Sequence, residues 1–168
     1  MSEFPVRVSS VEARRRSVVA RIWPRTELFE GLLRICEEHD VRAGCITTML
    51  GSLLRTRFVY PVPFPGARMG AKYVDPVGIE GPIELLGGSG FIGTMADDGR
   101  TVVHLHCVMS DPSMRVIGGH LLETGNPVMS TVEIMIEAFD DVSITRAFDP
   151  ETDFSLFSIG RAGDAPRG

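Results

Sequence analysis

Hydrophobic residues along this 168-residue chain recur mostly with the two-residue period of β-strands, and one segment follows the period of a helix instead. That segment is Thr26–His39, for which Thr26 is the expected N-cap. Its apolar residues form one stripe, as in a helix that packs against a sheet: Leu28, Leu32, Ile35 and Cys36. The pattern therefore predicts a single main helix.

Alternating apolar and polar residues predict strands over much of the remaining chain. The clearest is Thr131–Phe139, where apolar residues alternate with Glu133 and Glu137, so that one face is buried and the other is wet. The other predicted strands are Ser17–Trp23, Gly44–Leu50, Leu53–Tyr60, Ile83–Leu86, Ser89–Thr94, Thr101–Met109, Met114–Leu122 and Asp153–Ile159. Many strands, one helix and no internal repeat predict an α+β fold, an antiparallel sheet with one main helix packed on it.

The length of the chain suits one domain. We expect it to span residues 17–159, after an irregular segment over 1–16 and before a flexible tail over 160–168. Inside the domain, Pro61–Gly78 is rich in proline and glycine and cannot be a central strand. It predicts a surface loop, which is a common location for functional residues.

The net charge of −5 bears on the choice of partner. Proteins that bind DNA phosphates usually carry a basic field, because counterion release drives that binding. The only tight basic cluster is Arg14, Arg15 and Arg16, and three adjacent arginines in a polar segment are more typical of a solvated tail. Charge therefore does not favour direct contact with DNA.

The cysteines and the N-terminal segment indicate the compartment. Cys36, Cys45 and Cys107 form no CxxC motif and are odd in number, as expected of reduced, buried thiols in a cytoplasmic protein. The first residues lack the apolar stretch of a signal peptide, and no apolar run approaches the ~18 residues of a membrane span. Neither secretion nor membrane insertion is predicted.

Three of the four histidines lie close together in the sequence: His104, His106 and His120. Residues i and i+2 of a strand point to the same face, so His104 and His106 stand side by side, about 7 Å apart at their Cα atoms. A turn at Ser110–Ser113 then reverses the chain. If its loop has three residues, His120 lies opposite His104 on the shared face, whereas a two- or four-residue loop sends it to the other face.

Three converging imidazoles would resemble an open site for a divalent metal, zinc first, with three protein ligands and a position left for water. A carboxylate such as Glu84, Glu123 or Glu133 would then fix the ring tautomers. The alternative is that these histidines are core or interface residues bonded to backbone groups. Cys107 should point to the opposite face, which disfavours a Cys–His nucleophilic pair.

Two further features carry less chemistry. The Gly87–Gly90 segment lacks the lysine of a phosphate-binding loop and no helix follows it, so a tight turn or bulge is favoured and no nucleotide cofactor is predicted. His39, at the end of the predicted helix, interacts favourably with the helix dipole.

Several motifs together resemble the plant-and-prokaryote-conserved (PPC) domain in its stand-alone prokaryotic type, a group described as DNA-binding. They are GPIELLGGSGFIG (Gly81–Gly93), HLHCVMSD (His104–Asp111) and IGGHLLETGNPVMSTVEIMI (Ile117–Ile136). The resemblance runs in order from about Ser17 to Asp149. It implies an antiparallel sheet carrying a helix, assembled as a homotrimer. Plant members add AT-hooks with an RGRP motif, which this sequence lacks.

Three classes of function follow. One is a DNA-associated module, as the resemblance implies. Another is a metal-dependent lyase or decarboxylase-like enzyme acting on a small oxo- or hydroxy-acid, because stand-alone members are similar in fold to acetolactate decarboxylases. In that case Glu133 or Glu84 would carry a proton, and Arg55 or Arg115 would hold a carboxylate. The third is a trimer that binds a metal or a ligand without turnover.

Overall fold

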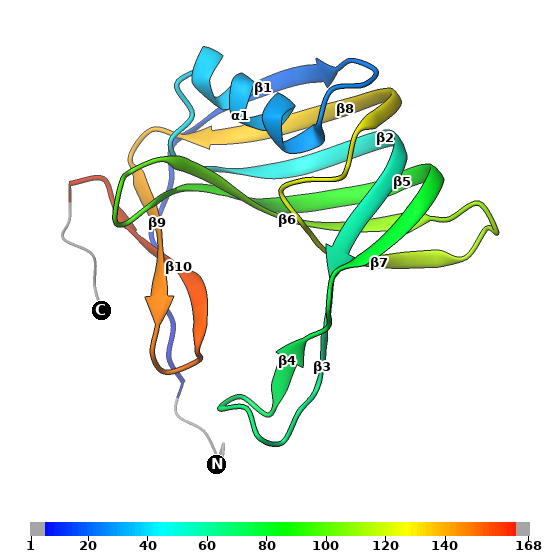
Figure 1. Ribbon diagram of the computed structural model, residues 1–168. Helices are drawn as coiled ribbons and strands as arrows, with labels where there is room; N and C mark the ends of the chain where they lie inside the picture. Colours follow the sequence, from blue (N-terminus) through cyan, green and yellow to red (C-terminus); the bar gives the residue numbers. More distant parts are fainter. Residues whose placement is uncertain (1–5, 164–168) are drawn as a thin grey trace.

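The structure, a computed structural model, describes residues 6–163. In that range it has one helix, α1 (Leu28–Glu38), and ten strands (Figure 1). The strands are β1 (Arg15–Ile22), β2 (Gly44–Val59), β3 (Pro61–Pro63), β4 (Ala71–Tyr73), β5 (Val77–Met95), β6 (Thr101–Ser110), β7 (Val116–Leu121), β8 (Val128–Phe139), β9 (Val142–Asp149) and β10 (Phe154–Arg161).

Eight strands form one sheet in the order β1-β8-β2-β7-β6-β5-β9-β10, and β3 pairs with β4 in a separate hairpin. The long strand β2 also pairs with β5, so β2, β5, β6 and β7 curl into a closed unit. All pairings are antiparallel except the short one between β5 and β9. The predicted α+β fold with an antiparallel-dominated sheet and one helix is confirmed.

The helix covers one face of the sheet, while the hairpins β3–β4 and β9–β10 project from the opposite side (Figure 1). The predicted stripe is buried together with core residues of β2 and β8 such as Ile46 and Ile136. Each fully buried aliphatic side chain of this size contributes about 1.5–3 kcal/mol relative to an exposed one. The core therefore lies between the helix and the sheet and leaves the other face of the sheet uncovered.

The start of the helix differs from the prediction. Glu27, not Thr26, occupies the N-cap position, with extended backbone and no side-chain capping bond. The Thr26 carbonyl instead accepts a hydrogen bond from the Val128 amide (2.9 Å), and the Arg25 amide donates one to the Val128 carbonyl (2.8 Å). The Glu27 carboxylate accepts a hydrogen bond from the Asn126 amide (2.6 Å). Pairing with the segment before β8 thus holds residue 26 outside the helix.

Some predicted strand breaks do not occur. Gly51 lies inside the continuous strand β2, and Gly87 lies inside β5, each beside a register shift. Gly51 has φ 149° and closely approaches the Thr131 carbonyl, so a side chain would collide there. Bulges absorb these glycines without ending the strands. The turn at Asp98-Gly99 is present, with Gly99 at φ 70°.

The sequence pattern did not reveal β9, because its polar and small residues mask the alternation of Val142 and Ile144. The Pro61–Gly78 segment, predicted as a loop, contains the β3–β4 hairpin and the start of β5. At the chain ends, β1 begins at Arg15 and β10 extends to Arg161. The outermost parts of the predicted irregular segment and tail, residues 1–5 and 164–168, lie outside the described residues.

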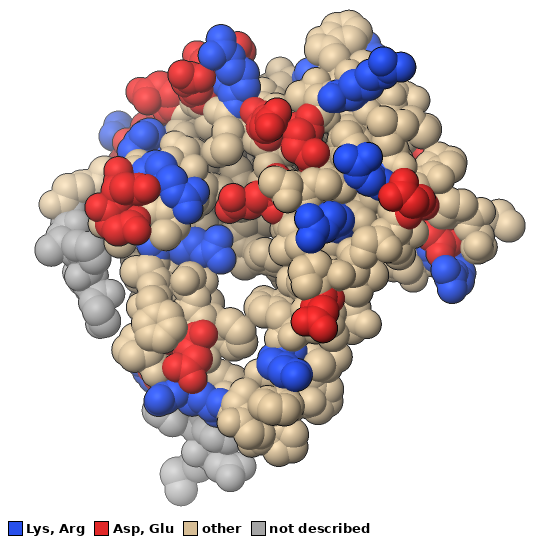
Figure 2. Space-filling view, viewed as in Figure 1, with Lys and Arg blue, Asp and Glu red and all other residues tan. Residues whose placement is uncertain are grey.

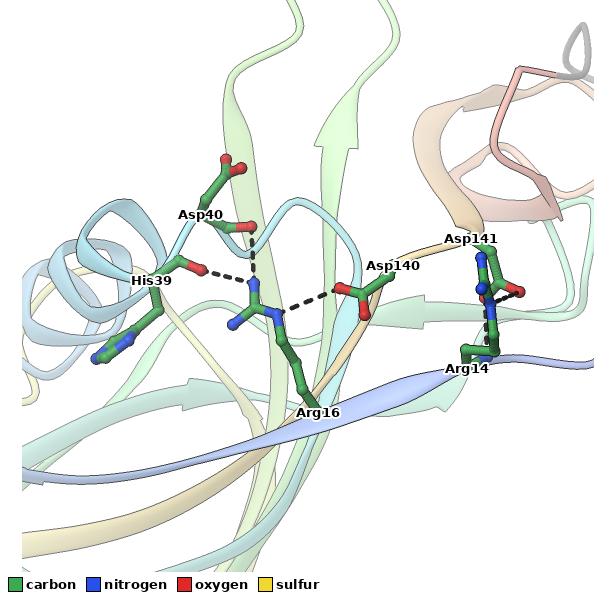
Figure 3. A network of polar contacts seen from close by, with 6 residues as sticks. All are labelled: Arg14, Arg16, His39, Asp40, Asp140 and Asp141. Carbon is green, nitrogen blue, oxygen red and sulfur yellow. Dashed lines mark hydrogen bonds and ion pairs between the residues drawn. The ribbon is translucent and has the colours of Figure 1, made fainter.

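The arginine cluster belongs to the sheet edge and not to a solvated tail. Arg16 donates to the backbone carbonyls of His39 (2.6 Å) and Asp40 (3.2 Å) and pairs with Asp140, and Arg14 pairs with Asp141 (Figure 3). Arg15 lies 3.6 Å from the buried carboxylate of Glu137. Each arginine therefore faces an acidic partner. No helix in the described part of the chain has the length and hydropathy needed to span a bilayer.

Candidate metal centre

The strands β6 and β7 bring the three histidines together on the uncovered face of the sheet. In β6 the odd-numbered residues point into the core, so Leu105 and Cys107 are buried, while His104 and His106 point outward. Cys107 therefore faces away from the histidines, as predicted. Its burial raises the pKa of the thiol to about 12, so the group is a packed thiol and not a nucleophile.

The turn between β6 and β7 sets the register. Asp111 accepts hydrogen bonds from the amides of Ser113 (2.8 Å) and Arg115 (3.0 Å), and its carboxylate pairs with the Arg115 guanidinium (2.6 Å). The loop consequently has five residues, with Ser110 opposite Val116, in place of the three expected from the sequence. An odd loop length keeps His120 on the shared face, but its cross-strand partner is His106 and not His104.

The histidine triad (His104, His106 and His120) is compact. One ligand nitrogen from each ring lies within 4.8 Å of the other two. The Nε2 atoms of His104 and His106 are 2.9 Å apart, close to the roughly 3.3 Å expected between two nitrogens bound to one tetrahedral zinc ion. No carboxylate or thiol of residues 6–163 joins this group. The triad can hold a metal and leaves part of its coordination sphere free.

The protonation state of the triad suits metal binding. Burial lowers the pKa of both His104 and His120 to about 4, and repulsion from the neighbouring rings adds to this effect. Both rings are therefore neutral at pH 7, the form in which imidazole binds metals. The Nδ1 atom of His120 is also buried without a hydrogen-bond partner in the described chain. Such an unpaired atom is costly unless a ligand or ion satisfies it.

Aromatic side chains from both projecting hairpins line the space beside the triad. The Tyr73 ring lies 6.0 Å from His120 and makes an edge contact with Phe154 at 5.6 Å, and the Phe157 ring lies 6.1 Å from His104. An ion pair between Arg68 and Asp153 (3.3 Å) joins the two hairpins. Figure 2 shows an opening between the hairpins that carry Tyr73 and Phe157, the residues whose rings lie beside His120 and His104.

A second hollow of about 360 Å³ adjoins the triad on the β2 side. It is lined by Cys45, Ile46, Ser89, Gly90, Phe91, His104 and His106. The triad is therefore reached from two sides, and a ligand of small size has room beside His104 and His106.

Close backbone packing explains the glycines around the histidines. A side chain at Gly90 would collide with the backbone carbonyl of His104, and one at Gly118 or Gly119 would meet the carbonyl of Cys107 or Val59. The Gly87–Gly90 segment is thus a bulged part of β5 that lets β6 approach, and not a turn.

We expect Gly90→Ala to lower the free energy of unfolding by about 1–3 kcal/mol, because the backbone of β6 must move to accept the methyl group. The matched control is Gly87→Ala on the same strand, where nothing lies within 4 Å of the added carbon. The control should stay within about 0.5 kcal/mol of wild type. Urea unfolding measures both, and equal losses would contradict the packing argument.

The deciding comparison is with a family model. The model of the Plants and Prokaryotes Conserved (PCC) domain matches residues 9–140, well over half of the chain. The chain belongs to this family. This is the family that the sequence motifs indicated, and the match includes all three histidines.

Solved structures share the PCC fold over nearly the whole chain. A metal-containing protein from Archaeoglobus fulgidus has 21% identity and a TM-score of 0.72, with 90% of this chain and 99% of that chain covered. A PPC protein from Pyrococcus horikoshii has 20% identity and a TM-score of 0.71, covering 90% and 97%. A candidate DNA-binding protein from Bacteroides thetaiotaomicron has 18% identity and a TM-score of 0.69, covering 87% and 96%.

One curated relative also matches this PCC protein. It is the bifunctional protein GlmU of Synechococcus sp. (strain JA-3-3Ab), 26% identical over 145 residues, which is 86% of this chain. The chain spans 21% of the length of that relative, so the similarity concerns a part of the larger protein.

The other predicted site residues of the PCC domain lie apart from the triad. Glu84 is opposite Ser110, and Glu133 lies on β8, opposite Arg21 and Leu50. Neither belongs to the compact group of possible ligands, nor does Glu123. Among the arginines, Arg115 is held by Asp111 and Arg55 is exposed on β2, opposite Glu80.

Sequence reasoning missed Tyr73, Arg146, Phe154 and Phe157. Tyr73 lies in the Pro/Gly-rich segment, whose composition did indicate a functional location. The residues of β9 and β10 gave no such signal, because only the folding of the hairpin against the sheet places them beside the histidines.

Proposed function

We propose that this PCC-domain protein binds one divalent metal ion per subunit through His104, His106 and His120, and that zinc is its metal. The observation that carries the proposal is the convergence of three ring nitrogens within 4.8 Å, with an unpaired buried nitrogen on His120. The fold resembles that of a protein from Archaeoglobus fulgidus that contains metal. Imidazole nitrogen is a preferred ligand of zinc.

The chemistry of the site follows from its openness. The three imidazoles would hold the ion and leave a position free, and the ion would supply a Lewis acid that can polarise a carbonyl oxygen or lower the pKa of water. The chain's own residues supply the rest: Tyr73 and Phe157 wall the opening and restrict water, and the triad fixes the position of the ligand. This arrangement suits a small molecule, including an oxo- or hydroxy-acid.

We also propose that the protein is a homotrimer, as the family resemblance implies. Support comes from apolar side chains on the sheet face that the helix leaves uncovered: Val19 is 75% exposed, Val116 69% and Val108 50%. Monomeric proteins rarely expose such extended apolar surface. Burial of this face against further copies of the same chain would remove it from water.

Native mass spectrometry of untagged protein tests both parts in one measurement. We expect an ion of about 55 kDa, three times the 18.4 kDa chain, carrying three zinc ions. Val19→Glu, on the apolar face but away from β6, should reduce the trimer and leave the metal bound. Leu33→Glu, on the helix at the opposite side, is the matched control. A metal-free trimer would refute the metal site, and a metal-bound monomer would refute the assembly.

DNA association is the alternative, and it is supported by the similarity to the candidate DNA-binding protein from Bacteroides thetaiotaomicron. The charges of this chain oppose it, because the arginines of the 14–16 cluster are paired and basic and acidic side chains are intermingled on the face in Figure 2. Fluorescence anisotropy with a labelled duplex at 50 mM and 200 mM salt distinguishes the two. Tight binding that weakens steeply with salt would favour the DNA role.

A further inference from the structure

Arg146 lies on the inner side of the β9–β10 hairpin, near the triad. It is the cross-strand partner of Phe157, and its guanidinium carbon is 5.9 Å from the centre of that ring. The same ring is 6.1 Å from His104. Residues Ile144 and Val142, two and four positions earlier on the same face, are buried. The inner face of β9 is therefore apolar near the sheet and cationic beside the histidines.

The charge of Arg146 has no acidic partner among the described residues. Its hydrogen bond there goes to the Ser155 carbonyl, at 3.4 Å. By contrast, Arg68, on the other hairpin, is paired with Asp153 across the two hairpins.

The charge balance of the occupied site indicates the class of ligand. A divalent ion on three neutral imidazoles, beside an unpaired guanidinium, is strongly positive, and no carboxylate of residues 6–163 joins the triad. A buried or half-buried excess of positive charge is costly unless an anion neutralises it. Guanidinium binds carboxylate by two parallel hydrogen bonds, which makes it a selective partner for that group.

We propose that Arg146 is the anion-binding residue of this centre and that the ligand is a small carboxylic acid with an apolar substituent. The ligand's carboxylate pairs with Arg146 and its apolar part contacts Phe157 and Tyr73, while an ion held by the triad would supply the partner for its hydroxyl or carbonyl oxygen. The inference rests on the proposed metal site and deepens it. Two of its residues, Arg146 and Phe157, lie beyond the part of the chain that the PCC family model matches.

Isothermal titration of the zinc-loaded full chain tests this proposal with two probes. One is 3-phenyllactate, which has a hydroxyl, a carboxylate and an aromatic ring, and the other is 3-phenyl-1,2-propanediol, which lacks the carboxylate. We expect Arg146→Gln to weaken 3-phenyllactate binding by about 10- to 100-fold, as for the loss of a hydrogen-bonded charge pair. The diol should bind weakly and equally to both proteins. Arg146→Lys should be intermediate.

The control is Arg161→Gln, an exposed arginine on the same hairpin, which should leave 3-phenyllactate binding unchanged. Zinc content and thermal unfolding of each variant show that the centre is still formed. Two outcomes overturn the assignment of Arg146 and leave the metal site standing. One is equal binding of 3-phenyllactate by wild type and Arg146→Gln, and the other is a zinc-loaded wild type that does not bind 3-phenyllactate at all. Failure of the wild-type chain to hold zinc would instead refute the metal site on which the assignment rests.

Discussion

Replacing His106 with alanine is expected to weaken zinc binding at least about 100-fold, since even the loss of a residue that only supports a ligand costs 10- to 100-fold. The His106 side chain is exposed, so its removal opens no cavity in the core. The fold should therefore survive, and the loss should appear in metal affinity. Competition with a chromophoric chelator measures that affinity directly.

Thermal unfolding gives a second measure of the same effect. A ligand at about 1,000 times its dissociation constant stabilises the folded state by roughly 4 kcal/mol, which corresponds to about 8–16 °C for a chain of this size. Wild type should show this shift on addition of zinc, and His106→Ala should lose it.

The matched control is His39→Ala. His39 ends the helix, and its backbone amide and carbonyl keep their bonds to Ile35 and Arg16 whatever side chain is present. This variant should bind zinc as wild type does. An equal loss of zinc in both variants would mean that the ion binds elsewhere, and an unchanged affinity in His106→Ala would mean that the triad is not the site.

Lowering the pH should destabilise the metal-free protein over a pH range set by the pKa values of His104 and His120. His104 and His120 titrate near 6.5 in the unfolded chain and at about 4 in the folded chain, because burial first, and then repulsion between the rings, disfavours their charged forms. Between these values the unfolded chain binds more protons. The free energy of unfolding therefore falls as the pH drops from about 7 to about 4, and the two rings contribute no pH dependence above that window.

The size of the effect is limited by solvent, since both rings are only about half-buried. After allowance for screening we expect about 1–2 kcal/mol per ring. Urea unfolding in the presence of a chelator, at pH 7.5 and pH 4.5, measures the difference. Protonation of carboxylates such as Asp111, whose pKa is lowered by its bonds to Arg115, also contributes to acid sensitivity.

Comparison with His120→Gln isolates the contribution of the ring. This variant should lose less stability between the two pH values than wild type, while His39→Gln should behave as wild type does. If His120→Gln shows the same loss as wild type, the depressed titration of the triad is refuted.

The register of the β6–β7 hairpin separates what could be predicted from what could not. Side chains alternate in a strand, so HLH at residues 104–106 by itself placed two histidines on one face and Cys107 on the other. The sequence did not reveal the length of the loop. Asp111 binds two amides and a guanidinium, and these bonds make the loop five residues long and place His120 opposite His106.

The walls of the centre depended wholly on tertiary structure. Tyr73 and Phe157 are far apart along the chain, with several strands of the sheet between them, and neither belongs to a motif around the histidines. They meet the triad because β3–β4 and β9–β10 both project on the side opposite the helix (Figure 1). Such contacts join residues far apart in the chain, so no local pattern encodes them.

The sequence by itself determined the family, the α+β class, the amphipathic helix and the identity of the three clustered histidines, because periodicity and short motifs are local properties of the chain. Only the tertiary structure decided which histidines are neighbours across the hairpin, that side chains of both projecting hairpins lie beside them, and that Arg146 packs near Phe157 next to His104. These features depend on loop geometry and on packing between distant segments, which local sequence patterns do not specify.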